Sequence, residues 1–103
     1  MATKAGIEFN FRKAMNQADQ IDNLANNLSN LSRNRFAGTM QGISASWKGD
    51  NASLYLGKGE RLQGNMDGSA SELHSIASDI RTVARRLYRA EMAALEIAMR
   101  REY

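Results

Sequence analysis

Few residues of this chain have side chains that commonly catalyse reactions or bind metal ions. His74 is the single histidine and there is no cysteine, so no second strong ligand exists to complete a zinc site. The carboxylates Asp67, Glu72 and Asp79 are not three or four residues apart, so they form no paired acid–base site. No serine stands in a nucleophile elbow, and Gly57-Lys58-Gly59 lacks the spacing of a phosphate-binding loop. We therefore expect no enzyme activity, no metal and no cofactor.

Positive charge is concentrated in one short segment of the second half of the chain. Four arginines lie close together, three of them spaced as on one face of a helix: Arg81, Arg85, Arg86 and Arg89. Such a face can contact phosphates, so a small basic nucleic-acid-binding protein is one alternative. Tyr88 is the only aromatic residue among them, and acids return at Glu91 and Glu96. The arginines are equally consistent with a solvated face or with an acidic partner.

Length and composition are those of a small globular domain. The 103 residues suffice for one domain, residues 1–103, of which 24% are charged, with a net charge of +3. The first thirteen residues include charges and no apolar run, so we expect no secretory signal peptide. No stretch is long and apolar enough to cross a bilayer, although an amphipathic, membrane-active helix over 73–99 is another alternative. Composition alone favours a soluble cytoplasmic protein.

Apolar residues recur every three or four positions over most of the chain, which is typical of helices. We predict one helix over about 10–45, weakened near 33–38 where the spacing changes, and a second over about 52–99. No proline interrupts helices of this length. We expect their apolar residues to form the core: Ala14, Ala18, Ile21, Leu24, Leu28, Leu31, Phe36, Met40 and Ile43, then Leu62, Met66, Ala70, Leu73, Ile76, Ile80, Val83 and Leu87.

Two short segments flank and separate these helices. Alternating apolar residues at 7–11 predict an extended lead-in, and Asn10 is a suitable cap for the helix that follows. Within the connection at 46–51, Gly49 can adopt the positive φ that ends a helix, and Asp50 or its neighbour can cap the next. Because the connection is short, the two helices must run antiparallel. The second helix is longer, so its C-terminal end should extend beyond the start of the first.

A hairpin of two helices cannot cover all of this apolar surface. Beside the stripe that contains Leu87, a second one recurs at helical spacing: Ala84, Tyr88, Met92, Leu95 and Met99. A lone hairpin buries only one face of each helix. We therefore predict an all-α fold, a helical hairpin that dimerises into a four-helix bundle.

The predicted turn contains Trp47-Lys48-Gly49. A W-x-G tripeptide at the midpoint of a proline-free, two-helix chain of this length resembles the WXG family, the small ESAT-like or Esx-like proteins of type VII secretion systems. The resemblance covers almost the whole chain and includes Tyr55 and the heptads after Leu73. It implies a non-enzymatic secretion substrate or export partner, in which Trp47 packs the turn and lies beside the partner's export signal.

The C-terminal helix adds a second likeness to this family. Members of Gram-positive type carry a large apolar residue, an acid four residues later, and small or apolar residues at further steps of three and four. Leu87, Glu91, Ala94 and Ala98 match this pattern, whereas Tyr88 precedes Glu91 by three residues and misses the related Tyr-x-x-x-Asp/Glu signal. The resemblance implies an export signal in this segment, with Glu91 as an exposed acid beside apolar side chains.

The resemblance also implies partners and a location. The partner would be a second copy of this chain, another WXG-like chain, or the helical N-terminal domain of a larger secreted toxin. A type VII secretion ATPase would read the export signal, and the protein would leave the cytoplasm without a cleavable signal peptide. The sequence distinguishes neither homodimer from heterodimer nor effector from chaperone.

Overall fold

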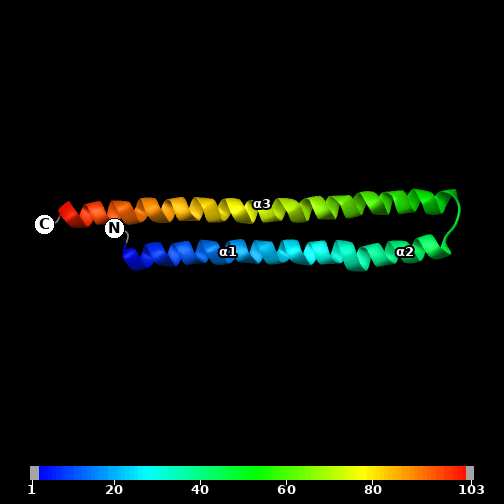
Figure 1. Cartoon of the computed structure of the whole chain (residues 1–103), viewed down its shortest axis with the longest axis horizontal. Helices are drawn as coiled ribbons and strands as arrows, with labels where there is room; N and C mark the ends of the chain where they lie inside the picture. Colours follow the sequence, from blue (N-terminus) through cyan, green and yellow to red (C-terminus); the bar gives the residue numbers. More distant parts are fainter. Residues whose placement is uncertain (1–2, 102–103) are drawn as a thin grey trace. The chain divides into compact units, whose positions relative to one another are not determined.

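The computed structural model describes residues 3–101, and nearly all of them are helical. Helix α1 spans Lys4–Asn30, a π-helical segment η1 spans Leu31–Phe36, α2 spans Ala37–Ser46 and α3 spans Asp50–Arg101 (Figure 1). No strand occurs in this described range. The fold is therefore an all-α helical hairpin, as the apolar periodicity predicts.

The N-terminal helix begins earlier than predicted. Residues 7–11 lie inside α1, so the expected extended lead-in is wrong, and Asn10 is not a cap. Thr3 caps the helix instead: its Oγ1 accepts the Gly6 N–H at 3.0 Å, and its carbonyl accepts the Ile7 N–H at 2.9 Å. Ile7 is only 3% exposed. The apolar residues at 7 and 11 therefore share a helical face, four residues apart, and their alternation with polar residues is incidental.

The first predicted helix is interrupted where its apolar spacing changes. At η1 the Ala37 N–H is directed to the carbonyls of Ser32 and Asn34, and the bond to Ser32 spans five residues. A π-helical turn accommodates one extra residue within a helix. The Ser32 carbonyl also accepts the side-chain amide of Gln63 at 3.3 Å. The five-residue apolar step that predicts a weak helix thus falls at a π-helical segment.

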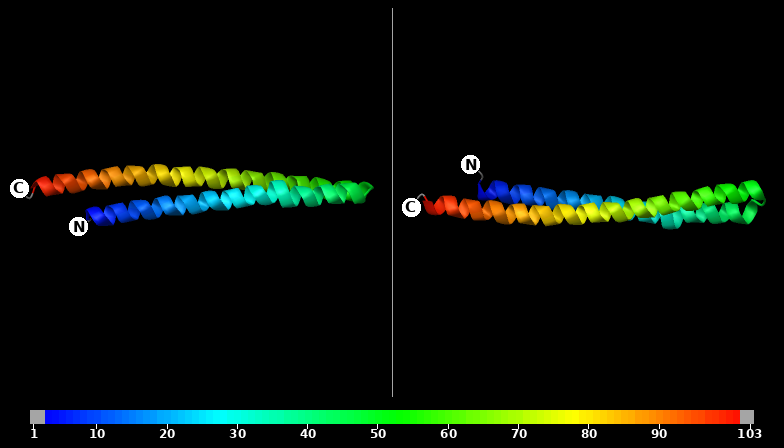
Figure 2. Two further views of the ribbon diagram at one scale, coloured as in Figure 1. Left: turned by 60° about the horizontal axis from the view of Figure 1, so that its bottom comes forward. Right: turned by 90° about the horizontal axis from the view of Figure 1, so that it is seen from above.

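The chain divides into two compact units, and the division falls within α1 and α3. Unit 1 combines α1 up to Ile21 with α3 from Ser75. Within it the two helical segments lie side by side and antiparallel, and the C-terminal end of α3 extends beyond the start of α1 (Figures 1 and 2). The Phe11 and Tyr88 rings are in contact, with centroids 4.8 Å apart.

Unit 2 runs from Asp22 to His74 and contains the rest of α1, η1, α2, the connection and the first half of α3. In Figure 2 its two helical arms again lie beside each other. Gly59 of α3 lies against the Met40 side chain of α2, and a Cβ at that position would force the flexible end of Met40 to move.

Apart from Ile7, the buried residues of both units are small. In unit 1 they include Ala18, Ala77 and Ala84, and in unit 2 they include Ala25, Ser32 and Ala70. On each helix these positions recur every seven residues, which is the period of a coiled-coil seam. We call these six residues the small-residue seam. Side chains of this size allow two helices to approach closely but bury little apolar surface.

The large apolar residues expected in the core are not buried within the single chain. Those that are largely exposed are Leu24, Leu31, Leu62, Ile76, Val83 and Leu87. The predicted core is thus confirmed for Ala18 and Ala70, which are buried, and wrong for these six large residues, because the small-residue seam occupies the contact between the helices. Much of the apolar side-chain surface of the hairpin therefore faces solvent.

Candidate interaction surfaces

The connection between α2 and α3 has well-defined backbone geometry. Trp47 leaves the helix with an extended backbone (φ −108°, ψ 128°), and its N–H donates to the Ile43 carbonyl at 2.8 Å. Gly49 has a φ of 110°, which side-chain-bearing residues rarely adopt. Its carbonyl accepts the Ser53 N–H at 3.1 Å and so begins α3. Asp50 therefore lies in the first turn of α3, where its charge favours the helix dipole, and is not the cap.

The aromatic side chains at this connection face solvent. Trp47 is 53% exposed, and its ring centroid lies 6.1 Å from that of Tyr55 in a tilted arrangement. Lys58 places its Nζ 5.4 Å from the Tyr55 centroid. Trp47 therefore packs against Tyr55 at the turn, and its side chain is not buried. Its exposed part is available to another molecule.

The residues of the expected export signal do not share one exposed face. Leu87 and Ala94 are exposed, whereas Glu91 and Ala98 are half-buried. Tyr88 is half-buried as well and stacks on Phe11 of α1. The expectation of an exposed Glu91 is thus wrong. Glu91 lies one helical turn beyond Leu87 and, seven residues after Ala84, continues the line of the seam.

A shallow apolar groove lies beside this segment in unit 1. It has a volume of about 620 Å³, and its lining residues are Lys4, Arg89, Met92, Ala93, Leu95, Glu96 and Met99. Three of them belong to the second apolar stripe predicted from the sequence. Methionine and leucine side chains adapt to varied apolar partners. The groove thus adds to the uncovered apolar surface at the C-terminal end of α3.

A line of exposed, mostly apolar residues follows α3 alongside the seam. Its members are seven residues apart and all exposed, and only the serine among them is polar: Tyr55, Leu62, Ser69, Ile76, Val83, Ala90 and Ile97. We call this set the exposed heptad. Three of its members, Ser69, Ile76 and Val83, directly precede the seam residues Ala70, Ala77 and Ala84. Apolar spacing alone merges the two lines into one stripe. The seven-residue recurrence of alanine at 70, 77 and 84 is the signal that separates them.

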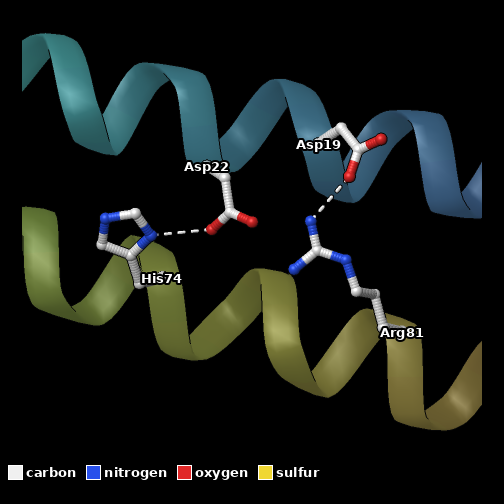
Figure 3. A network of polar contacts seen from close by, with 4 residues as sticks. All are labelled: Asp19, Asp22, His74 and Arg81. Atoms are coloured by element: carbon white, nitrogen blue, oxygen red, sulfur yellow. Dashed lines mark hydrogen bonds and ion pairs between the residues drawn. The ribbon is translucent and has the colours of Figure 1, made fainter.

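Figure 3 shows two polar contacts between side chains of α1 and α3, one between Asp19 and Arg81 and one between Asp22 and His74. On α3, both Arg81 and His74 lie on the side of the seam away from the exposed heptad. In unit 1, Arg81 donates to an Asp19 carboxylate oxygen at 2.7 Å. In unit 2, His74 Nδ1 lies 2.7 Å from Asp22 Oδ1. His74 is therefore a member of an interhelical pair and not simply a solvated side chain. In each unit, this contact thus marks a polar side of α3, opposite its apolar one.

The basic segment is partly used by the fold itself. Arg81 is committed to Asp19, while Arg85, Arg86 and Arg89 remain exposed. No group of three or more His, Cys, Asp or Glu residues that could hold a metal ion occurs within residues 3–101. Over the same range, no helix is both long and apolar enough to cross a membrane.

Comparisons with known proteins found no relative of this chain. No protein-family model matches the chain, and neither a curated protein nor a solved structure matches it. Functional inference therefore rests on the surfaces described above and on the sequence resemblance.

Proposed function

We propose that this chain is a small type VII secretion substrate or export partner that acts through helix-bundle protein–protein interaction. The observation that carries the proposal is the exposed heptad of α3, beside a seam made of small residues. Covering the exposed half of each large side chain contributes about 1 kcal/mol. A partner helix pair therefore gains several kcal/mol by completing a four-helix bundle, which is the assembly that the WXG resemblance implies.

The turn and the C-terminal segment have separate roles in this proposal. Exposed Trp47 lies at the helix connection, where it can contact a partner without being needed for the fold. Leu87, Tyr88 and Glu91, with Ala94 and Ala98, form the segment read by the secretion ATPase. The bundle partner is a second copy, another WXG-like chain, or the helical N-terminal domain of a larger toxin. No catalytic role is proposed for any of these surfaces.

Secretion from a host with a type VII system tests this function directly. The tagged chain should reach the medium in a strain with an active secretion ATPase and stay in the cells when the ATPase is inactive. Glu91→Ala should reduce export while helicity and mass in solution stay unchanged, with the exposed acid Asp67→Ala as the matched control. Export that is independent of the ATPase, or normal export of both Glu91→Ala and Tyr88→Ala, would remove the secretion assignment.

The nucleic-acid alternative predicts a different result. The exposed Arg85, Arg86 and Arg89 would contact phosphates, so binding to duplex DNA would weaken steeply as salt is raised. The pairing of Arg81 with Asp19 removes one of the four arginines from such a face. We therefore favour the secretion role and expect no retention of DNA at physiological salt.

A further inference from the structure

Within unit 1, one side of α3 has the residue pattern of a complete coiled-coil interface. Ile76, Ile80, Val83 and Leu87 follow each other at steps of four, three and four. Ile76 is 47% exposed, Val83 52% and Leu87 54%, while Ile80 is half-buried. Four large aliphatic residues at this spacing are more than one solvated helix face normally carries.

Two opposite charges border this stripe along the same edge. Asp79 directly precedes Ile80, and Arg86 directly precedes Leu87, so the two lie seven residues apart at equivalent positions of the heptad. Both side chains are exposed. Neither forms an ion pair within the part of the chain that the structure describes, residues 3–101. Both side chains are therefore free to pair with charges of another chain.

From this arrangement we infer that α3 pairs with α3 of a second copy, antiparallel, about a two-fold axis near Thr82. This inference rests on the proposed function and deepens its bundle assembly by naming the partner and the register. In this register Ile80 lies beside Val83 of the second copy, and Ile76 lies beside Leu87. Asp79 then faces Arg86 of the second copy, and the two-fold axis repeats the contact. The surface is self-complementary, as an isologous interface requires.

The two charges select this register against its neighbours. Sliding the helices by one heptad in one direction brings Asp79 against Asp79 of the second copy. Sliding them by one heptad in the other direction brings Arg86 against Arg86. Each alternative keeps apolar residues in contact but places like charges side by side on the axis, which is unfavourable. Of these three registers, the central one pairs both charges with opposite ones.

The choice of a second copy follows from this symmetry. An unrelated partner helix would need charges matched to Asp79 and Arg86. Such a partner would not require that the two charges on α3 itself be opposite and one heptad apart. A two-fold pairing requires both features. Capture of a different chain by the same stripe is therefore one of the outcomes that the experiment must detect.

Charge-swapped variants test the pairing. Sedimentation of the full chain should show a dimer of the 11.4-kDa protomer at micromolar concentration. Asp79→Arg and Arg86→Asp should each raise the dissociation constant about tenfold or more, since two attractive contacts become repulsive. The double variant Asp79→Arg/Arg86→Asp should return to within about threefold of wild type. Asp67→Arg, on the polar side of α3, is the matched control and should leave the constant unchanged.

Mixing the two single variants gives a second, independent test. One variant then carries two positive charges along this edge, and the other carries two negative charges. The mixture should therefore dimerise, although each variant alone does so poorly. Circular dichroism of every variant shows whether it folds, and Val83→Asp should remain helical but sediment as a monomer. A monomeric wild-type chain, or a double variant that stays as weak as the single ones, would overturn the inference. Secretion is measured separately, so an exported monomer refutes this pairing alone, while a dimer that is not exported refutes only the secretion role.

Discussion

Replacing Ala77 by leucine tests whether the small-residue seam holds the hairpin together. Ala77 is fully buried in unit 1, where Asp19–Arg81 and Phe11–Tyr88 contacts hold α1 against α3. Leucine adds three carbon atoms at a position with no free surface. Overpacking of this kind costs about 1–3 kcal/mol. We therefore expect Ala77→Leu to lower the free energy of unfolding by about 2 kcal/mol, although leucine is more apolar than alanine.

Urea denaturation followed by circular dichroism measures this change, at one fixed protein concentration because the proposed dimerisation would add to stability. For a chain of this size about 2 kcal/mol corresponds to a Tm lower by roughly 8–16 °C. Ala93→Leu is the matched control, since Ala93 is exposed on the side of α3 away from the seam and should change stability by less than about 0.5 kcal/mol. An Ala77→Leu variant as stable as wild type would show that the helices are not closely packed there.

The same assay checks four further changes. Ser32→Ala should raise the free energy of unfolding by about 1 kcal/mol, because the buried Ser32 hydroxyl has no hydrogen-bond partner in the described range; a lower stability would mean that the hydroxyl is satisfied. Gly59→Val should cost about 1 kcal/mol because it displaces the flexible end of Met40, and Met40→Ala in the same chain should recover part of that loss, whereas simple additivity would refute the contact. Gly49→Val should cost about 1–3 kcal/mol because of its positive φ, and Gly49→Asn clearly less; equal costs would argue against backbone strain. Trp47→Ala should cost about 1 kcal/mol, since more than half of Trp47 is exposed, and a loss above about 3 kcal/mol would show that a partner buries it.

Periodicity predicts the helices of this chain well and their ends poorly. Two long helical segments follow from apolar residues at steps of three and four, and the π-helical segment η1 coincides with the one place where that step fails. The start of α1 differs from the prediction because Thr3, and not Asn10, is the cap. Similarly, Gly49 rather than Asp50 precedes the first turn of α3. Caps depend on single hydrogen bonds, whereas periodicity averages over many residues.

The position of the seam is harder to predict, because small side chains are buried there while large apolar side chains are exposed. Hydrophobicity favours burial of large side chains such as Leu24 and Val83, yet Ala25 and Ala84, their direct neighbours, are buried. Close helix approach requires small side chains, and it leaves the large ones free for a second interface. Hydrophobicity alone cannot separate the two lines, because both are largely apolar with a period of seven residues. Side-chain size along each line separates them.

Assembly and export make competing demands on the same turn of α3. Leu87 belongs to the stripe that we propose to pack against a second copy, and it also begins the proposed export signal. Tyr88 stacks on Phe11, and Glu91 is half-buried on the line of the seam. A receptor that binds Leu87 must therefore displace the second copy. A receptor that binds Tyr88 and Glu91 must displace the first turns of α1. Helix ends open more readily than helix interiors, and α1 begins close to this site, as the groove lined by both Lys4 and Met92 shows. Fraying of α1 as far as Phe11 would expose Tyr88 and Glu91 without breaking the proposed α3–α3 pairing. In such a dimer a receptor would reach these two residues first, and Leu87 only after the two copies separate.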